Sequence, residues 1–385
     1  MLICKNLKVL HLSESSLPDW RIEKSAITAR REGYDVFFAG EQNKHNYKNF
    51  IFNKIYQIHW NFRAKYKFPF FYQILKKKIN NIIKEIKPDL IHAHNIFPAK
   101  LASEFDIPFV FDDHEYSSMH GKVIYESFKI RQSLDKSKNK IRWIARKSLK
   151  QYMSNLWTEW EKEIVSKYPT ITVSERIADE LKKYINGNKI YIVPNVPLKN
   201  EIPNLASPDY HTELSSVYMG SDGLATFPYP NRDISGLVET FNNNEIGSLD
   251  IIGWNDKKNE NSKIRFHGYV SRDNIFKLLT KSSIGLVPWK KHWSHYYVNP
   301  NKTYEYVHAG LLVMCTSDLT TISSLLKGNC ILFDDYNDLV QKLKYFSNNI
   351  EELNKLRIKS FNFAKENLIW EKYDHNIINA YKSLA

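Results

Sequence analysis

Two residues between positions 299 and 317 have types and spacing that could bind a phosphorylated sugar. Lys302 and Glu305 lie one helical turn apart in the sequence NPNKTYEYVHAGLLVMCTS. Pro300 can begin a helix because its missing N–H needs no partner there, and Gly310 can end one because it tolerates positive φ. The positive end of such a helix suits a phosphate, and a carboxylate one turn later can accept hydrogen bonds from a sugar diol. The segment predicts a phosphate and sugar site, with a plain surface ion pair as the competing interpretation.

Short apolar runs alternate with helix-length segments along the whole chain. The alternation predicts parallel sheets built from βαβ units, and the runs fit strands covered on both faces because they lack strict polar alternation. The runs are 8–12, 35–40, 89–94, 109–114, 170–174 and 190–194 in the first half, and 216–220, 249–253, 264–268, 284–288, 311–316 and 330–334 in the second. Ligands bind beyond the carboxyl ends of such strands. His94, His114, Gly220, Pro288 and Lys302 fall there.

The segment around Lys302 resembles the donor site of GT-B glycosyltransferases similar to family 4. The matching residues are Pro300, Lys302, Glu305, Tyr306, Ala309 and Gly310, followed by LLVMCTSD. Other segments that resemble the family are PDLIHAHN (88–95), FVFDDHE (109–115), ITVSERIADEL (171–181), IYIVPN (190–195), LDIIG (249–253) and IRFHGYVSRDNIFKLLTKSSIGLVP (264–288). The resemblance implies an α/β fold of GT-B type. In that fold, two doubly wound Rossmann-like domains face a central cleft, and a C-terminal helix crosses back to the first domain.

The Pro- and Asn-rich stretch 194–208 has no periodic apolar pattern and is typical of a linker. We therefore expect an acceptor-binding domain at residues 1–195, a linker at 196–210 and a nucleotide-sugar-binding domain at 211–362. Residues 363–385, with Trp370, Tyr373 and Tyr381, should form the crossover helix that packs on the N-terminal domain.

The resemblance implies a donor-binding set in the second half. Gly220 and Ser221 match the glycine turn after the first strand of that domain, and Arg232 falls on the position of a phosphate-binding lysine. An arginine can bind phosphate through two parallel hydrogen bonds. Residues 222–231 are additional to the family pattern, which leaves the placement of Arg232 open, and a solvent-facing helix start is the alternative. The remaining donor residues of this set are Pro288, Asn301, Lys302, Thr303 and Glu305.

The resemblance places His114 beside the transferred sugar and, with Lys302 and Glu305, in the catalytic set. A neutral imidazole can hydrogen-bond a sugar hydroxyl or move a proton, although a structural histidine is the competing interpretation. The acceptor side is predicted to include His94 and the loop after the first strand, which has serines where the family usually has glycines. The loop residues of this set are Ser15, Ser16, Asp19 and Arg21.

One position departs from the family's E-x7-E pair. Glu305 matches the second glutamate, which contacts the nucleotide ribose in relatives, but Tyr297 stands at the first. The resemblance implies a retaining hexosyltransferase, and Tyr297 leaves retention or inversion open. We expect no metal or other cofactor, because His92 and His94 have the spacing of two ligands but no third is evident. Cationic side chains and helix N-termini would then neutralise the diphosphate.

Composition bounds the class of protein. A chain of 385 residues exceeds the usual size of a single core, which favours two domains. No run of about 18 apolar residues is present, and the first residues do not resemble a signal peptide. The three cysteines, Cys4, Cys315 and Cys330, have no metal-ligand spacing and indicate a reduced, cytosolic protein.

The net charge of +13 is concentrated in two segments. Residues 44–87 hold eleven Lys or Arg and one acid, and residues 122–150 hold ten and two. The first segment is also rich in aromatic residues, a composition typical of peripheral binding to an anionic membrane. A solvated basic face is the plainer interpretation. Nucleic-acid binding is disfavoured because no such motif accompanies the charges.

These patterns favour a glycosyltransferase that moves a sugar from a nucleotide-sugar donor to a glycan or lipid-linked acceptor in cell-surface polysaccharide or glycolipid synthesis. We expect it in the cytoplasm, peripherally at the inner face of the cell membrane. The alternatives are a nucleotide-sugar epimerase of the same fold and a noncatalytic glycan- or nucleotide-sugar-binding protein.

Overall fold

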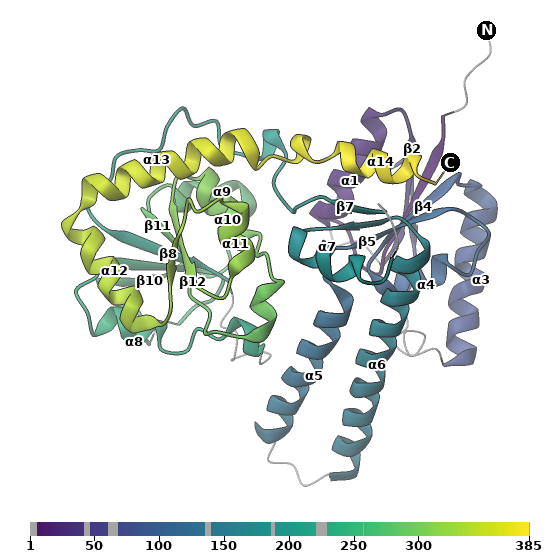
Figure 1. Ribbon diagram of the computed structural model, residues 1–385, viewed down its shortest axis with the longest axis horizontal. Coiled ribbons are helices and arrows are strands. Elements are labelled where there is room, and N and C mark those ends of the chain that lie inside the picture. The colour runs from purple at the N-terminus through teal and green to yellow at the C-terminus, as the bar shows by residue number, and fades with distance from the viewer. Residues whose placement is uncertain are drawn as a thin grey trace. The chain divides into compact units, whose positions relative to one another are not determined.

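A computed structural model of the chain describes residues 6–41, 47–60, 68–134, 140–185, 189–220, 229–256 and 258–384. The chain forms two compact units (Figure 1). The first contains residues 1–125, 139–195 and 373–385, and the second contains residues 126–138 and 196–372. Each unit has one parallel β-sheet with helices packed on it.

The sheet of the first unit has the strand order β3-β2-β1-β4-β5-β6-β7. Its strands are β1 (Lys8–Leu12), β2 (Asp35–Gly40), β3 (Lys54–Gln57), β4 (Leu90–His94), β5 (Phe109–Asp113), β6 (Thr170–Thr172) and β7 (Ile190–Ile192). The helices are α1 (Trp20–Arg31), α3 (Pro69–Ile86), α4 (Ile96–Ala102), α5 (Ser117–Leu134), α6 (Lys140–Lys167), α7 (Glu175–Lys182) and α14 (His375–Lys382). The strand order reverses between β1 and β4, and a crevice at such a point is the usual ligand site.

The sheet of the second unit has the strand order β10-β9-β8-β11-β12-β13. Its strands are β8 (Ser215–Met219), β9 (Ser248–Ile252), β10 (Ile264–Phe266), β11 (Ile284–Val287), β12 (Leu312–Thr316) and β13 (Ile331–Phe333). The α-helices are α8 (Leu237–Asn242), α9 (Arg272–Leu279), α10 (Lys302–His308), α11 (Thr320–Leu325), α12 (Tyr336–Asn348) and α13 (Ile350–Asn367). The described part of the unit also contains the 3-10 helices η1 (Lys199–Glu201), η2 (Pro230–Arg232), η3 (Trp293–Tyr296) and η4 (Trp370–Lys372). The order reverses between β8 and β11.

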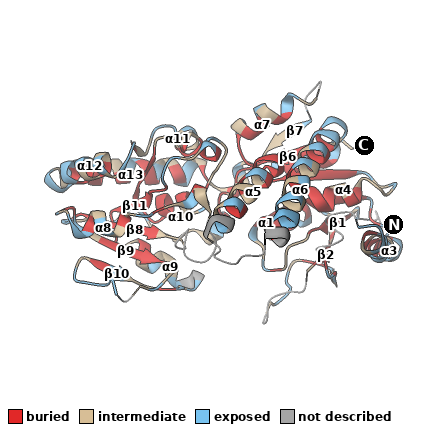
Figure 2. Cartoon of the chain, turned by 90° about the horizontal axis from the view of Figure 1, so that it is seen from below, coloured by how far each residue is buried: buried red, intermediate tan, exposed pale blue. Residues whose placement is uncertain are grey.

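The cores consist of the strands and the inner faces of the helices, which are coloured red in Figure 2. Central strands such as β4, β5 and β12 are buried along their whole length, as expected for strands covered on both faces. The prediction of an α/β protein with two parallel sheets is confirmed.

The C-terminal helix α14 belongs to the first unit, although α13 and η4 belong to the second. It contacts α1 and the strands β5, β6 and β7. Tyr381 Oη lies 2.8 Å from His92 Nδ1, and Asn376 Nδ2 donates to the carbonyl of Ile192 at 2.9 Å. The chain therefore crosses back to its first domain, as predicted.

The basic segment 44–87 has a mixed structure. It includes the edge strand β3 and the helix α3, and its aromatic residues Phe52, Trp60 and Tyr72 are buried in the core. Phe62 and Tyr66 lie outside the described residues. Phe50, Phe68 and Phe70 are exposed. Within the described residues, no helix is long and apolar enough to cross a membrane.

Helices α5 and α6, which contain most of the basic segment 122–150, meet near the start of α5. A Cβ on Gly121 would lie 3.2 Å from the Cα of Ser154, so glycine allows the two backbones to approach here. Deeper in the unit, Glu161 on α6 accepts a hydrogen bond from the backbone N–H of Ser118 at 3.0 Å. This acceptor satisfies one of the free N–H groups at the start of α5.

Candidate functional site

Helix α10 holds Lys302 in its first turn and is seven residues long, within the span that the sequence predicts between Pro300 and Gly310. Tyr306 fixes this helix against the sheet. Its hydroxyl accepts from the N–H of Met219 at 2.8 Å and donates to the carbonyl of Leu286 at 3.3 Å. A Cβ on Gly285 would lie 2.3 Å from the Tyr306 ring, so glycine gives the ring room to pack on β11. The helix start is thereby held beside the ends of β8 and β11.

Gly220 follows β8 and lies directly beside the Lys302 ammonium. A Cβ at Gly220 would be 2.8 Å from Lys302 Nζ and 2.7 Å from Tyr218 Oη. A Cβ at Gly253, which follows β9, would be 2.3 Å from the carbonyl oxygen of Gly220. The two glycines let the backbone approach closely at the point where the sheet reverses, which is the arrangement that a phosphate-binding turn needs.

Two aromatic rings surround the Lys302 ammonium. Nζ lies 4.4 Å from the ring centroid of Tyr218 and 4.9 Å from that of Trp289. Among the described residues, no carboxylate forms an ion pair with Nζ. Burial, followed by the charge of Arg232, lowers the pKa of Lys302 to about 7, while Glu305 opposes the shift. An anion bound here would raise this pKa and favour the charged ammonium, so the arrangement is compatible with an anionic ligand.

The rings of Tyr218 and Trp289 form an aromatic cage around Lys302 Nζ. Arg232 lies beside this cage, at the end of η2. Its guanidinium carbon is 5.5 Å from the ring of Tyr229 and 6.0 Å from the ring of Trp289, and the side chain is exposed. Lys302 and Arg232 thus approach the same indole. The structure therefore brings together the two cations that the sequence suggested as phosphate ligands. Ser221 lies outside the described residues.

The other predicted donor residues surround this centre. Pro288 is buried after β11, and its carbonyl accepts from Tyr336 Oη at 2.9 Å. Asn301 is exposed at the start of α10, and Glu305 is half-buried one turn after Lys302. Thr303 is buried, and within the part of the chain that the structure describes its hydroxyl has no hydrogen-bond partner. The positions of Asn301 and Glu305 leave both side chains accessible to a ligand.

In the first unit, Asp112 is the centre of a buried polar network at the end of β5. Its carboxylate accepts from Arg21 Nε at 3.0 and 2.8 Å and from Arg21 Nη2 at 2.7 Å. The Arg21 Nη1 group donates to the carbonyl of Val193 and to Asn195 Oδ1, both at 2.8 Å. The pKa of Asp112 lies well below its usual range because the positive charge of Arg21 and contacts from His92 and His94 outweigh its burial. The predicted acceptor residue Arg21 is therefore held in a structural ion pair.

His114 follows β5 directly and remains slightly exposed, at 12% of its side chain. Its Nδ1 is 3.9 Å from Asp112 Oδ1, a distance that is too long for a hydrogen bond. Nδ1 is buried and has no hydrogen-bond partner among the described residues. The ring therefore turns one nitrogen towards a fixed carboxylate, and its role towards a sugar stays a prediction.

Three buried histidines form a stack between β1 and β4. His11 Nδ1 lies 3.1 Å from His94 Nε2, and the ring centroids of His92 and His94 are 4.3 Å apart with 13° between their planes. Burial lowers the pKa of each of the three histidines, that of His94 to about 3, so the rings are neutral. His94 is fully buried, which places it away from solvent.

The same three histidines offer nitrogen atoms within 4.8 Å of one another, as a metal site would. Their rings are nearly parallel, at 13° to 31°. Imidazole lone pairs lie in the ring planes, and stacked planes do not meet at a common ion. A second candidate set is His94, Asp112 and His114, but Arg21 already occupies both oxygens of Asp112. The geometry of both sets fits a hydrogen-bonded network better than an ion.

The loop between β1 and α1 contains the remaining predicted acceptor residues. Asp19 is the N-cap of α1, and its carboxylate accepts from the N–H groups of Arg21 and Ile22. Ser15 and Ser16 are half-buried, and the carbonyl of Ser15 accepts from the N–H of Glu41 at 3.1 Å. Asp19 therefore has a structural task in helix capping, while the roles of the two serines towards an acceptor stay predictions.

Sequence reasoning missed two features of these sites. The first is the aromatic cage of Tyr218 and Trp289, although Trp289 adjoins the predicted Pro288. The second is the buried carboxylate pair of Asp113 and Glu161, in which burial and mutual proximity raise the pKa of Asp113 well above its usual value. Glu161 is distant in sequence, on α6, and only folding brings it to Asp113.

The comparisons with known proteins agree with this architecture. Residues 26–196 match the family described as Glycosyltransferase Family 4. No curated protein sequence matches the chain. Among solved structures, sucrose-phosphate synthase from Thermosynechococcus elongatus superposes with a TM-score of 0.71 at 12% identity, over 98% of this chain and 99% of that one.

Two further structures are similar. Anabaena Alr3699/HepE in complex with UDP has a TM-score of 0.67 at 10% identity, over 98% of this chain and 100% of that one. A UDP-N-acetylglucosamine 2-epimerase has a TM-score of 0.53 at 11% identity, over 92% of this chain and 90% of that one. At these identities the likeness concerns the fold. The chain thus has the fold of GT-B glycosyltransferases and resembles glycosyltransferase family 4, through residues 26–196 of its first domain.

Proposed function

We propose that the protein is a glycosyltransferase that moves a sugar from a nucleotide-sugar donor to a glycan or lipid-linked acceptor in the synthesis of a cell-surface polysaccharide or glycolipid. One observation carries this proposal. The Lys302 ammonium lies in an aromatic cage beside Gly220, at the strand reversal of the second sheet, and Arg232 approaches the same cage. Such an arrangement suits a diphosphate at the crevice where nucleotides bind in open α/β sheets.

In this proposal Lys302 and Arg232 bind the diphosphate and stabilise its charge as the glycosidic bond to the donor breaks. Glu305 accepts hydrogen bonds from the ribose, since an ionised carboxylate is an acceptor only. His114 of the first domain binds a hydroxyl of the transferred sugar. Because two cations and the start of α10 can neutralise the diphosphate, the reaction needs no metal or other cofactor.

Uridine diphosphate is the nucleotide part of the donor in this proposal. HepE, which is similar in fold, was crystallised with UDP and with UDP-glucose. We further propose a hexosyl donor and retention of the anomeric configuration, as in family 4. NMR of the first-formed product decides the stereochemistry, because Tyr297 replaces a glutamate of the family pattern.

The alternative is a nucleotide-sugar epimerase, which is suggested by the structural similarity to UDP-N-acetylglucosamine 2-epimerase. The two activities differ in product. An epimerase converts UDP-N-acetylglucosamine to its epimer and needs no acceptor, whereas a transferase releases UDP only as the sugar passes to an acceptor or to water. Incubation with UDP-sugars followed by separation of UDP and of epimers distinguishes them.

We expect Glu305→Ala to lower the affinity for UDP and the release of UDP from its matching UDP-sugar by about tenfold or more. The reason is that a hydrogen bond to a charged group contributes about 1.5–3 kcal/mol. Thermal-shift titration with UDP and UDP-sugars measures the affinity, because ligand at 100 times its dissociation constant stabilises by about 2.7 kcal/mol. Glu351→Ala, at an exposed carboxylate in the first turn of α13, is the matched control. Equal UDP affinity in Glu305→Ala and wild type would remove the ribose assignment.

Peripheral membrane binding, from the cytoplasmic side, is a further part of the proposal. The exposed face of α3 carries Phe70 and Ile74, which are 71% and 53% exposed, followed by Lys77, Lys78 and Lys84. Exposed apolar side chains beside lysines suit an anionic lipid surface.

We expect Lys77→Glu with Lys78→Glu to weaken binding to vesicles containing phosphatidylglycerol by at least about 30-fold, because each lysine near such a surface contributes about 1 kcal/mol. Sedimentation with anionic and with purely zwitterionic vesicles measures this. Lys355→Glu with Lys359→Glu, on the exposed side of α13, changes the net charge equally and should have no effect. If the wild-type protein binds both kinds of vesicle alike, or neither, the membrane proposal is wrong.

A further inference from the structure

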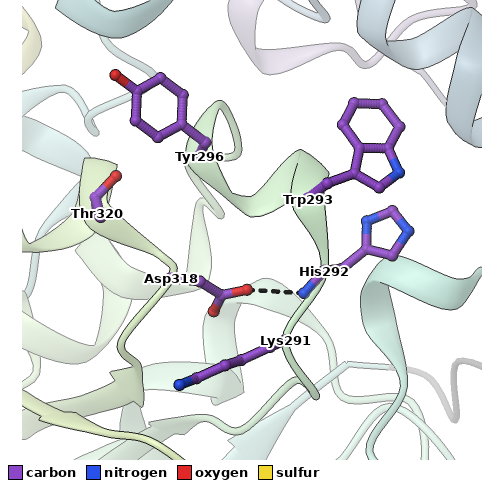
Figure 3. Close-up of a pocket in the computed structure, with 6 residues that line it drawn as sticks. All are labelled: Lys291, His292, Trp293, Tyr296, Asp318 and Thr320. Atoms are coloured by element: carbon purple, nitrogen blue, oxygen red, sulfur yellow. Dashed lines mark hydrogen bonds between the residues drawn. The ribbon is translucent and has the colours of Figure 1, made fainter.

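The second unit contains a pocket with a volume of about 460 Å³ beside η3 (Figure 3). It is lined by Lys291, His292, Trp293, Tyr296, Asp318 and Thr320. The side chains of Trp293 and Tyr296 project from η3 on either side of the space, and these residues are 44% and 39% exposed. The pocket falls within the range of about 300–1,000 Å³ that is typical of small-molecule sites.

The wall of the pocket is fixed before any ligand arrives. Asp318 Oδ2 accepts from the N–H of His292 at 2.8 Å and contacts His295 Nδ1 at 2.8 Å. The other nitrogen of His295, Nε2, is 2.8 Å from the carbonyl oxygen of Asn231. His295 is fully buried, so it ties η3 both to the end of β12 and to η2. A preformed wall lowers the entropy cost of binding.

The charged groups at the pocket are already paired. Lys291 Nζ donates to Asp334 at 2.6 Å, and Asp318 is engaged by His295. His292 Nδ1 accepts from the N–H of Ser294 at 3.2 Å, and its Nε2 lies 3.1 Å from Glu126 Oε2. Burial lowers the pKa of His292, although Glu126 opposes the shift. The pocket therefore offers no unpaired charge among the described residues that line it, and it suits an uncharged ligand.

An indole and a phenol ring are also held in place. Trp293 Nε1 donates to Glu126 at 2.9 Å, and Glu126 belongs to the stretch of α5 that groups with the second unit. The ring is thereby anchored at one edge while nearly half of the residue remains exposed. Fixed, amphipathic aromatic rings next to polar groups match a molecule that has apolar C–H faces and a polar rim.

We propose that this pocket is a carbohydrate subsite that binds one pyranose ring, stacked on Trp293 and hydrogen-bonded at its rim by polar groups such as Thr320 and Lys291. A pyranose combines an apolar face with uncharged hydroxyl groups, which is the chemistry that the pocket presents. The subsite deepens the proposed transferase function, but its occupancy can be measured without transfer. The ring has two sources, the sugar of the donor or a sugar unit of the acceptor glycan.

Two side chains, those of Trp289 and His295, connect the surroundings of Lys302 with the pocket. The ring of Trp289, which faces Lys302, lies 5.7 Å from the ring of His295, and His295 holds Asp318 at the pocket. The two sites are nevertheless lined by different side chains. Substitutions at Trp293 and at Lys302 therefore separate sugar binding from diphosphate binding.

Saturation-transfer NMR tests the subsite. The probes are the methyl glycosides of glucose, galactose, mannose and N-acetylglucosamine at millimolar concentration, with the full chain. At least one should receive saturation from the wild-type protein, and Trp293→Ala should reduce its signal at least about fivefold. Trp293→Phe, which keeps an aromatic face, should retain more than half. Tyr345→Ala, at a 49% exposed tyrosine on α12, is the matched control and should change nothing.

Further measurements show whether the bound pyranose belongs to the donor or to the acceptor. They also test the subsite independently of the proposed transferase function. Displacement of the glycoside by UDP-glucose but not by UDP assigns the subsite to the donor sugar, and an unchanged signal assigns it to the acceptor. Lys302→Met should bind UDP about a hundredfold more weakly and keep the glycoside signal, so a failure of the diphosphate assignment can be told apart from a failure of the subsite. The subsite proposal is overturned if no glycoside receives saturation, or if the signal persists in a Trp293→Ala protein whose melting temperature equals that of wild type.

Discussion

Lys302→Met should lower the affinity for UDP about a hundredfold while leaving the protein as stable as wild type or more stable. Truncation of one partner of a desolvated charge pair costs about 2–5 kcal/mol in binding. Methionine fills a similar volume between Tyr218 and Trp289 but cannot neutralise a diphosphate. Calorimetric titration with UDP measures the affinity, and thermal unfolding without ligand measures stability.

The sign of the stability effect follows from the pKa of Lys302. Unfolded lysine has a pKa near 10.4, whereas the folded value is about 7. Between these values the unfolded chain holds the extra proton, so this residue favours unfolding at neutral pH and the stability of the free protein rises with pH. A variant without the amine does not have this unfavourable contribution to the free energy of folding. A fall of several degrees in the melting temperature of Lys302→Met would contradict this.

The same lysine makes UDP binding depend on pH. Above pH 7 the free protein loses the Lys302 proton, and the diphosphate must recover it. UDP affinity should therefore fall as pH rises, by up to about tenfold per unit, with proton uptake visible in buffers of different ionisation enthalpy. Lys302→Arg keeps its charge and is the control, because its affinity should stay level from pH 7 to 9. Parallel pH profiles for both proteins would remove the proposed role of the ammonium.

Arg21→Ala should destabilise the first unit by about 3–5 kcal/mol, because it leaves the Asp112 carboxylate buried without its bidentate partner. Replacement of both residues by apolar ones, Arg21→Met with Asp112→Leu, should cost clearly less than the sum of the single changes. Hydrogen exchange on β4 and β5 under urea reports on this unit alone, which matters because a two-domain chain need not unfold in one step.

The second unit provides the matched control for that experiment. Arg265 also forms a bidentate pair, with Asp250 at 2.8 and 2.7 Å, but its side chain is 53% exposed. Arg265→Ala should cost about 1 kcal/mol or less. Similar costs at the two sites would show that burial does not decide the strength of these pairs.

The free energy of unfolding of the first unit should begin to fall at mildly acidic pH. The pKa of Asp112 is lowered in the folded state, so its contribution is present above the unfolded value near 4 and disappears as pH falls below it. The buried histidines begin to lower the stability at a higher pH than Asp112 does. The unfolded chain takes up protons below about 6.5, while the folded stack remains neutral. Both effects have the same sign, and both lower the stability of this unit as pH falls.

The fold could be predicted from sequence because it depends on repeated local patterns. Apolar runs of Val, Ile, Leu and Phe marked the central strands, and the Pro- and Asn-rich stretch lies close to Asn195, where the two units divide. Edge strand β3 was missed, since four residues with exposed or half-buried side chains carry no apolar run. The aromatic residues around β3 suggested a membrane segment, but Phe52 and Trp60 pack in the core.

Some of the proposed donor-binding residues could be predicted because they are close together in the sequence. Lys302, Glu305 and the glycine after β8 follow from helix and strand ends. The ion pair of Arg21 and Asp112 could not be predicted from the sequence. The two residues are 91 positions apart, and only the sheet brings α1 to the end of β5. The same applies to Trp293 and Asp318, which line one pocket because the ends of β11 and β12 are adjacent.

Helix α14 completes the first unit after the entire second unit has been made. During translation, the strands β5, β6 and β7 emerge from the ribosome long before the helix that will cover them. The first domain must therefore persist as an unfinished nascent fold, with the His92 side of its sheet lacking Tyr381, until α14 has been synthesised. Of the two units, the one whose synthesis begins earlier is therefore the one that is completed later.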